Sequence, residues 1–131
     1  MVVITKFEMH IRVRYQETDA QARVHHANYI TYFEVVRTEM LREAGFSYRD
    51  MEASGLFLVV AEAECKYRAP AVFDDLLCIS IETVKAKGVR IENHYEVRRD
   101  DEVIATGRTL LACVDKSGKP RPIPKNLRLP S

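Results

Sequence analysis

The sequence predicts one α+β domain in which a five-stranded antiparallel sheet curls around a single long helix. Its 131 residues suffice for one hydrophobic core and are too few for two. Five segments alternate between apolar and polar residues with the period of a strand, and one long segment has the period of a helix. Connections of hairpin length require antiparallel pairing, because parallel neighbours need a crossover of about a dozen residues or more. We therefore expect a single domain over residues 1–131.

The first strand is predicted over 5–15, because apolar side chains occupy every second position there. The helix is predicted over 28–44, where apolar side chains recur at spacings of three and four. We expect Asn28 to cap its N-terminus and Gly45 to end it in the left-handed conformation. A weaker pattern indicates a short helical turn over 47–53.

Four further strands are predicted, at 59–67, 75–87, 89–98 and 102–114. The residues at 99–101 are expected to form a tight hairpin, and those at 116–119 to turn the chain out of the sheet. The tail that follows is rich in proline and must be extended or irregular.

One helix covers only one face of such a sheet, so the other face meets solvent or another subunit. Four apolar residues are expected on that second face: Val60, Ile104, Leu110 and Val114. This surface favours a homo-oligomer, although scattered exposed aliphatic residues also occur on monomers.

Composition narrows the class of protein. The net charge is +1 and no basic arm or stripe is present, which argues against nucleic acid as the main partner. No apolar run reaches the length of a membrane span, and the first residues lack the pattern of a signal peptide, so we expect a cytoplasmic protein. Cys65, Cys78 and Cys113 are far apart and form no CxxC pair, so they are interpreted as small core residues rather than as disulfides or zinc ligands.

The segment ETDAQARVHHANY, residues 17–29, carries more chemistry than a connecting loop needs. Asp19 is too far from Asn28 to cap the helix, although a loop aspartate is most often a turn former. If the loop folds back over the helix N-terminus, free backbone N–H groups near His26 and Ala27 lie beside a carboxylate. That pairing suits attack on an activated carbonyl, with Asp19 as nucleophile or base and the N–H groups binding the oxyanion.

Other interpretations of the segment stay open. Glu17 is a rival carboxylate, because a spacing of two does not choose between it and Asp19. His25 and His26 are adjacent and would point to opposite sides of an extended segment, which argues against a shared metal ion. A partly buried structural histidine is as good an interpretation of either one as a catalytic histidine.

Charged residues outside the loop have simpler interpretations. Glu34 is expected to form a surface ion pair with Arg37, three residues along the helix. Lys87 and Arg90 flank Gly88 at a strand end, where they could contact phosphate groups or act as solvated turn residues.

A wider set of residues, spread over nearly the whole chain, forms a recognisable pattern. Its members are Tyr15 to Ala20, Val24, His26, Asn28, Tyr29, Phe33, Glu34, Arg37 to Glu39, Leu41, Tyr67 to Pro70 and Pro122 to Pro124. This pattern resembles the 4-hydroxybenzoyl-CoA thioesterase family, nearest its bacterial acyl-CoA thioesterase branch that includes the Tol-Pal-associated enzymes.

The resemblance implies a hotdog fold, hydrolysis of acyl-CoA thioesters, homodimers or homotetramers with sites at subunit interfaces, and no metal or redox cofactor. Asp19 matches the catalytic carboxylate of the family, and His26 falls where a backbone N–H polarises the thioester carbonyl. Tyr29 and Phe33 are candidates for the acyl pocket, with a core role as the alternative for both.

The chain departs from the family pattern at two positions. Ala22 stands where many members have glycine; a positive φ there would cost alanine about 1–2 kcal/mol, so the loop is expected to follow a different path. Arg23 replaces a common valine or histidine, and lies near the expected acyl entrance. We predict an acyl-CoA thioesterase, with a non-catalytic acyl-thioester-binding or assembly module as the main alternative and an enoyl-thioester hydratase as a third.

Overall fold

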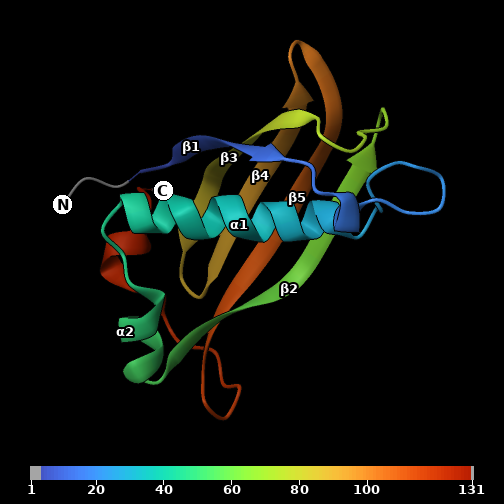
Figure 1. The fold of residues 1–131 in the computed structure, drawn as a ribbon. Helices are drawn as coiled ribbons and strands as arrows, with labels where there is room; N and C mark the ends of the chain where they lie inside the picture. The colour runs from blue at the N-terminus through green and yellow to red at the C-terminus, as the bar shows by residue number, and fades with distance from the viewer. Residues whose placement is uncertain (1–3, 131) are drawn as a thin grey trace.

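The computed structural model describes residues 4–130, in which five antiparallel strands wrap around one long helix (Figure 1). The helix α1 spans Asn28–Glu43, and a short helix α2 spans Tyr48–Ala53. The strands are β1 (Lys6–Arg12), β2 (Leu56–Tyr67), β3 (Leu76–Lys87), β4 (Arg90–Arg99) and β5 (Glu102–Asp115). This confirms the predicted hotdog architecture. Residues 1–3 and 131 of the predicted domain lie outside the described part.

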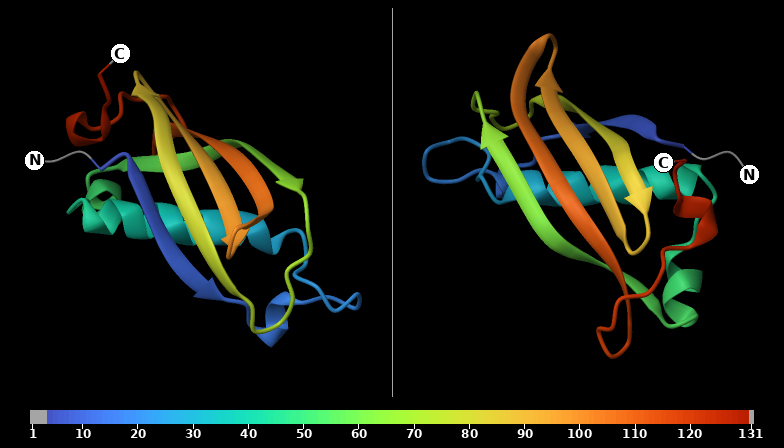
Figure 2. Two further views of the ribbon diagram at one scale, coloured as in Figure 1. Left: turned by 90° about the horizontal axis from the view of Figure 1, so that it is seen from above. Right: turned by 180° about the vertical axis from the view of Figure 1, so that it is seen from behind.

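The strands are ordered β1-β3-β4-β5-β2, and every neighbouring pair is antiparallel. Only β3, β4 and β5 are joined by hairpins in chain order; β2 crosses to the far side of β5, so β1 and β2 are the two edges. Figure 2 shows α1 running along the inner face of the curled sheet. Within residues 4–130, no helix is both long and apolar enough to cross a membrane.

The start of α1 differs from the prediction. Asn28 was expected to cap the helix, but it is the first helical residue, and Ala27 precedes it without a side-chain cap. The Asn28 side chain instead donates from Nδ2 to the backbone carbonyl of Glu17 at 2.8 Å. The amide therefore ties the preceding loop to the helix. At the other end, Gly45 has φ +82°, which confirms the predicted left-handed stop.

The exposed apolar surface also differs from the prediction. Ile104 is fully buried, because a register shift between Val97 and Arg98 turns it inward together with Ala105. Val60 pairs with Leu111 on the inner side of the sheet, yet is 51% exposed because β2 extends beyond the cover of α1. The β2 edge is thus one of several places with exposed apolar side chains; the others include Tyr15, Val72, Phe73 and Leu76.

Two further expectations need correction. Arg37 does not pair with Glu34 in the described part of the chain; its guanidinium points inward and donates to the Tyr95 hydroxyl at 3.3 Å. Of the cysteines, Cys113 is fully buried as predicted, whereas Cys65 and Cys78 are only half-buried.

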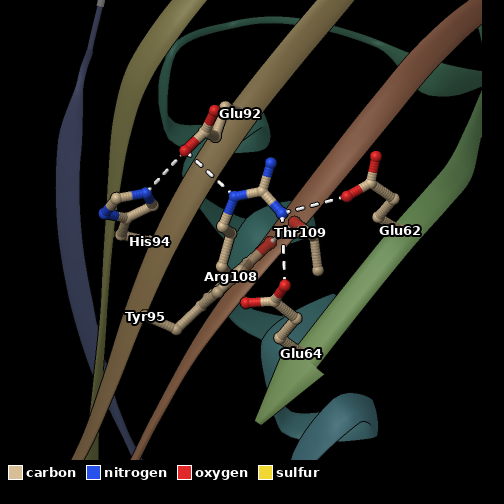
Figure 3. Close-up of polar contacts among 7 residues, drawn as sticks. All are labelled: Glu62, Glu64, Glu92, His94, Tyr95, Arg108 and Thr109. Carbon is tan, nitrogen blue, oxygen red and sulfur yellow. Dashed lines mark hydrogen bonds and ion pairs between the residues drawn. The ribbon is translucent and has the colours of Figure 1, made fainter.

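On the outer face of the sheet, Arg108 of β5 holds the edge strand β2 in place (Figure 3). Its guanidinium contacts Glu62 at 3.2 Å and Glu64 at 3.7 Å on β2, and Glu92 at 3.1 Å on β4. The His94 ring contacts the same Glu92 carboxylate at 2.8 Å. These contacts link the three strands β4, β5 and β2 on the outer face of the sheet.

The segment from Thr18 to Val24 is a compact hairpin loop. The Asp19 N–H donates to the Arg23 carbonyl at 2.9 Å, and the Ala22 N–H donates to the Asp19 carbonyl at 2.9 Å. Ala22 has φ +62°, the left-handed position that closes such a three-residue loop and that usually holds glycine. The loop therefore keeps this path with alanine, contrary to the expectation of a different one.

We predict that Ala22→Gly raises the free energy of unfolding by about 1 kcal/mol. Release of about 1–2 kcal/mol of left-handed strain exceeds the roughly 0.4–1 kcal/mol by which glycine stabilises the unfolded chain. Urea denaturation measures the change. Ala20→Gly in the same loop is the control, since Ala20 does not have a positive φ. Equal stabilities of the two variants would contradict a strained Ala22.

Candidate active site

A cleft of about 290 Å³ opens where the hairpin loop, the N-terminus of α1 and the end of β2 meet. It contains four of the residues selected from the sequence, namely Asp19, Arg23, His26 and Tyr29. Its remaining lining residues are Gln21, Val24, Tyr67, Arg68, Ala69 and Pro70. Segments far apart in the sequence therefore bring a carboxylate, two guanidinium groups, a histidine and two phenols to one place.

Asp19 is half-buried, and its two carboxylate oxygens differ. Oδ1 accepts a hydrogen bond from the Gln21 N–H at 2.8 Å, which fixes the orientation of the carboxylate. Oδ2 has no donor within residues 4–130. One oxygen is thus held by the loop, and the other is available to a molecule in the cleft.

Glu17, the other candidate carboxylate, uses both of its oxygens in hydrogen bonds within the protein. Oε1 accepts from the Arg14 N–H at 2.8 Å and from the Tyr32 hydroxyl at 2.9 Å, and Oε2 accepts from the Arg14 guanidinium at 3.0 and 3.1 Å. Burial raises the pKa of the Glu17 carboxyl, but these hydrogen bonds together lower it below its ordinary value. Glu17 is 7% exposed and absent from the cleft lining, so Asp19 is the carboxylate that can meet a substrate.

The backbone at His26 offers a free donor. In the described part of the chain, the His26 N–H has no acceptor, whereas its carbonyl accepts from the Tyr67 hydroxyl at 3.0 Å. The Ala27 N–H, also expected to be free, donates instead to Nδ1 of His25 at 3.1 Å. Of these two N–H groups, only that of His26 is without an acceptor within residues 4–130, and hydrogen bonds on both sides of His26 hold it in place.

The two adjacent histidines do not point to opposite sides, as was expected for an extended segment. Their rings stack with centroids 4.1 Å apart, because the chain turns here and Ala27 already has helical φ and ψ. No group of three or more His, Cys, Asp or Glu residues within 4–130 could hold a metal ion. His25 serves as an acceptor for backbone, while His26 lines the cleft.

The phenol rings of Tyr29 and Tyr67 meet at the floor of the cleft with centroids 5.5 Å apart. Burial raises the pKa of Tyr29 to about 12, so its hydroxyl remains protonated at neutral pH. Tyr67 was not selected as a site residue from the sequence, nor was its neighbour Arg68. The motif from Tyr67 to Pro70 was the available signal, but it did not indicate that Tyr67 would hold His26.

Three selected residues lie elsewhere. Phe33 is fully buried behind the cleft and does not line it. Lys87 and Arg90 face each other in the β3–β4 hairpin. In the sheet, Arg90 pairs with Ala112 of β5, and Tyr67 at the cleft pairs with Ala105 of the same strand. Ala105 and Ala112 are seven residues apart, so Arg90 lies about 23 Å along the strand direction from Tyr67. The chain itself does not bring Lys87 or Arg90 to the cleft.

Known proteins are similar to this chain in sequence and in fold. A family model described as "Thioesterase-like superfamily" matches residues 13–129. The acyl-CoA thioester hydrolase YbgC of Escherichia coli is 35% identical over 125 residues, which cover 94% of this chain and 93% of the relative. A crystal structure of a protein from Aquifex aeolicus superimposes with a TM-score of 0.87 at 36% identity, covering 92% of this chain and 95% of that one.

A crystal structure of DHNA-CoA thioesterase from Staphylococcus aureus superimposes with a TM-score of 0.87 at 30% identity, over 92% of this chain and 82% of that one. The family model covers the hairpin loop, α1 and all strands that form the cleft. The chain belongs to the thioesterase-like superfamily.

Proposed function

We propose that this chain hydrolyses acyl-CoA thioesters in the cleft that holds Asp19 and His26. One observation carries the proposal. Within residues 4–130, the Asp19 carboxylate has one oxygen without a hydrogen-bond donor, and the His26 backbone N–H in the same cleft has no acceptor. Thioester hydrolysis needs both a nucleophile or base and a donor for the oxyanion. The activities named for the Escherichia coli and Staphylococcus aureus relatives support the same chemistry.

In the proposed reaction, the thioester carbonyl oxygen accepts a hydrogen bond from the His26 N–H. Negative charge grows on that oxygen as the carbonyl carbon is attacked, and the N–H stabilises it. Asp19 either attacks directly, to give a mixed anhydride that water then hydrolyses, or removes a proton from the attacking water. In both routes the carbon–sulfur bond breaks, and coenzyme A leaves as the thiolate.

The rest of the cleft suits an acyl-CoA. Arg23 and Arg68 place two guanidinium groups at its lining, where they would meet the anionic part of the substrate. Tyr29 and Tyr67 supply an aromatic floor beside which the acyl group would lie. The left-handed Ala22 preserves the loop that aims Asp19, so the replacement of glycine there does not favour the non-catalytic binding module.

We further propose a homodimer formed through β2. This strand is a sheet edge of 12 residues with unpaired backbone groups, and it exposes Val59 at 41%, Val60 at 51% and Tyr67 at 51%. A long, apolar edge is normally covered, and a second copy that pairs with it antiparallel would extend the sheet. Tyr67 lies on this edge, so the cleft would open at the subunit interface. A tetramer would require an additional contact.

Such a dimer gives Lys87 and Arg90 a role that they lack in one chain. Antiparallel pairing along β2 turns the hairpin end of the partner towards the cleft end of this chain. The basic residues of one subunit would then lie on the side of the partner's cleft, where they would bind the phosphate groups of coenzyme A.

At the level of subfamily, we propose the 4-hydroxybenzoyl-CoA thioesterase family and its Tol-Pal-associated branch, on the residues from Tyr15 to Tyr29 that resemble it. A cytoplasmic location is part of the same proposal, and the free state of the three cysteines fits a reducing compartment.

The central prediction concerns Asp19→Asn. Removing the carboxylate should lower kcat/KM for acyl-CoA hydrolysis by about 100- to 10,000-fold, the range expected for loss of a catalytic acid or base. A thiol reagent that reports free coenzyme A measures the rate on a panel of acyl-CoAs. Asp101→Asn, in the exposed β4–β5 hairpin, is the control and should retain full activity.

Other outcomes of that assay identify the alternatives. A wild-type chain that binds acyl-CoA tightly without releasing thiol would be a binding module. One that adds water to an enoyl-CoA and leaves the thioester intact would be a hydratase. Either result contradicts a thioesterase.

The dimer is tested by mixing two impaired chains, Asp19→Asn and the double variant Lys87→Ala/Arg90→Ala. If the phosphate contacts come from the partner, half of the dimers become mixed and one of their two sites is intact. Assayed well below KM, the mixture should regain about one quarter of wild-type activity. Arg49→Ala mixed with Asp19→Asn controls for loss of an exposed positive charge outside the β3–β4 hairpin. No gain on mixing would contradict phosphate contacts supplied by the partner subunit.

A further inference from the structure

Phe33 lies on α1 between a residue that lines the cleft and a residue that lines a second pocket. Tyr29, Phe33 and Arg37 follow one another at four-residue spacing on the inner face of α1, so each is about 6 Å further along the helix. Tyr29 lines the cleft, and Arg37 lines a second, partly open pocket of about 30 Å³. Phe33 lines neither and is 0% exposed. It therefore stands where a wall between the two spaces must be.

The Phe33 ring is held in place by its contacts with β4 and β5. The Phe33 ring stacks on Tyr95 with centroids 4.3 Å apart and planes 15° apart. Its other neighbour is Gly107, where a Cβ would be 2.2 Å from Cε2 of Phe33, so only glycine allows the ring to lie on β5. The Tyr95 hydroxyl is fixed by Thr109 at 2.7 Å and by Arg37 at 3.3 Å; Figure 3 shows Tyr95 and Thr109 on neighbouring strands.

The pocket beyond Phe33 has a mainly apolar lining. Helix α1 contributes Met40 and Leu41, the sheet contributes Leu111, and the C-terminal tail contributes Leu127 and Leu129. Its polar lining residues are Arg37, Thr83, Asn93 and Asn126. Its present volume is that of one water molecule or little more, too small for an acyl chain. A substrate that reaches into the helix–sheet space from the cleft must therefore end at the Phe33 ring.

We propose that Phe33 sets the length of acyl group that the cleft accepts, by separating the cleft from this second pocket. The inference rests on the thioesterase function proposed above and specifies the substrate class: acyl groups that are short or compact enough to stop at Phe33. Shortening the side chain joins the cleft to the second pocket and makes room for longer chains. Phe33 is a specificity residue here and takes no part in the chemical step.

The test compares wild type, Phe33→Leu and Phe33→Ala on acetyl-, hexanoyl-, decanoyl- and palmitoyl-CoA, with folding checked by circular dichroism. Relative to acetyl-CoA, Phe33→Ala should raise kcat/KM for the longer substrates at least about tenfold, because a single methylene in an apolar pocket is worth that much or more. Phe33→Leu should give a smaller change in the same direction. Val36→Ala is the matched control: Val36 is equally buried on α1, but it lines neither space.

The control should lose stability and keep the wild-type order of substrates. The inference is overturned if folded Phe33→Leu, or Phe33→Ala where it folds, keeps that order too, or if Val36→Ala shifts it equally. Wild-type activity on any member of the panel separates this result from failure of the proposed function, which would show as no hydrolysis of any substrate.

Discussion

The buried Glu17 is the anchor on which the geometry of the cleft depends. Its carboxylate joins the Arg14 backbone and guanidinium to the Tyr32 hydroxyl of α1. Its carbonyl accepts from the His25 N–H and the Asn28 side chain, both at 2.8 Å. These contacts hold the loop against the start of the helix. Because the pKa of Glu17 is lowered, the carboxylate stays charged at neutral pH and the anchor is kept.

Because these contacts hold the loop in place, the reactive groups of the cleft can lack hydrogen-bond partners without loss of the loop conformation. Asp19 keeps one free oxygen, His26 keeps a free N–H, and Ala22 tolerates a left-handed backbone. Unpaired polar groups and backbone strain each cost stability, and they persist only where surrounding structure determines the conformation. Left-handed backbone also occurs at Asp74 and Asp100, so it is the combination of the three features beside one cleft that marks this loop.

Periodicity predicted the long helix, the short one and all five strands. Buried residues alternate along β3 and β4, whereas the edge strand β2 has no fully buried residue and was predicted from its sequence alternation alone. Periodicity failed where a single residue breaks the period. Ile104 was assigned to the outer face because strict alternation was assumed, and the register shift beside Val97 turns it inward. Asn28 was assigned as a cap from local preference, but a contact with Glu17, 11 residues earlier, determines its side chain.

The sequence indicated which loop would line the cleft, but not the contacts that each of its residues makes. Sequence spacing could not choose between Glu17 and Asp19, since the choice depends on which carboxylate is buried against Tyr32 and Arg14. The role of Tyr67 at His26 arises only when β2 passes the helix N-terminus, 41 residues further along the chain. Arg37 was assigned to the surface because its burial depends on Tyr95, a partner 58 residues away.

The most direct measurement is a crystal structure of the chain with a non-hydrolysable acyl-CoA analogue in which a methylene replaces the sulfur. The ketone oxygen of the analogue should lie about 2.7–3.2 Å from the His26 nitrogen. The free oxygen of Asp19 should face the carbonyl carbon, directly or through one water. An analogue whose carbonyl lies away from both groups, or an Asp19 side chain turned to bulk solvent in the complex, would contradict a carboxylate-driven thioester hydrolase.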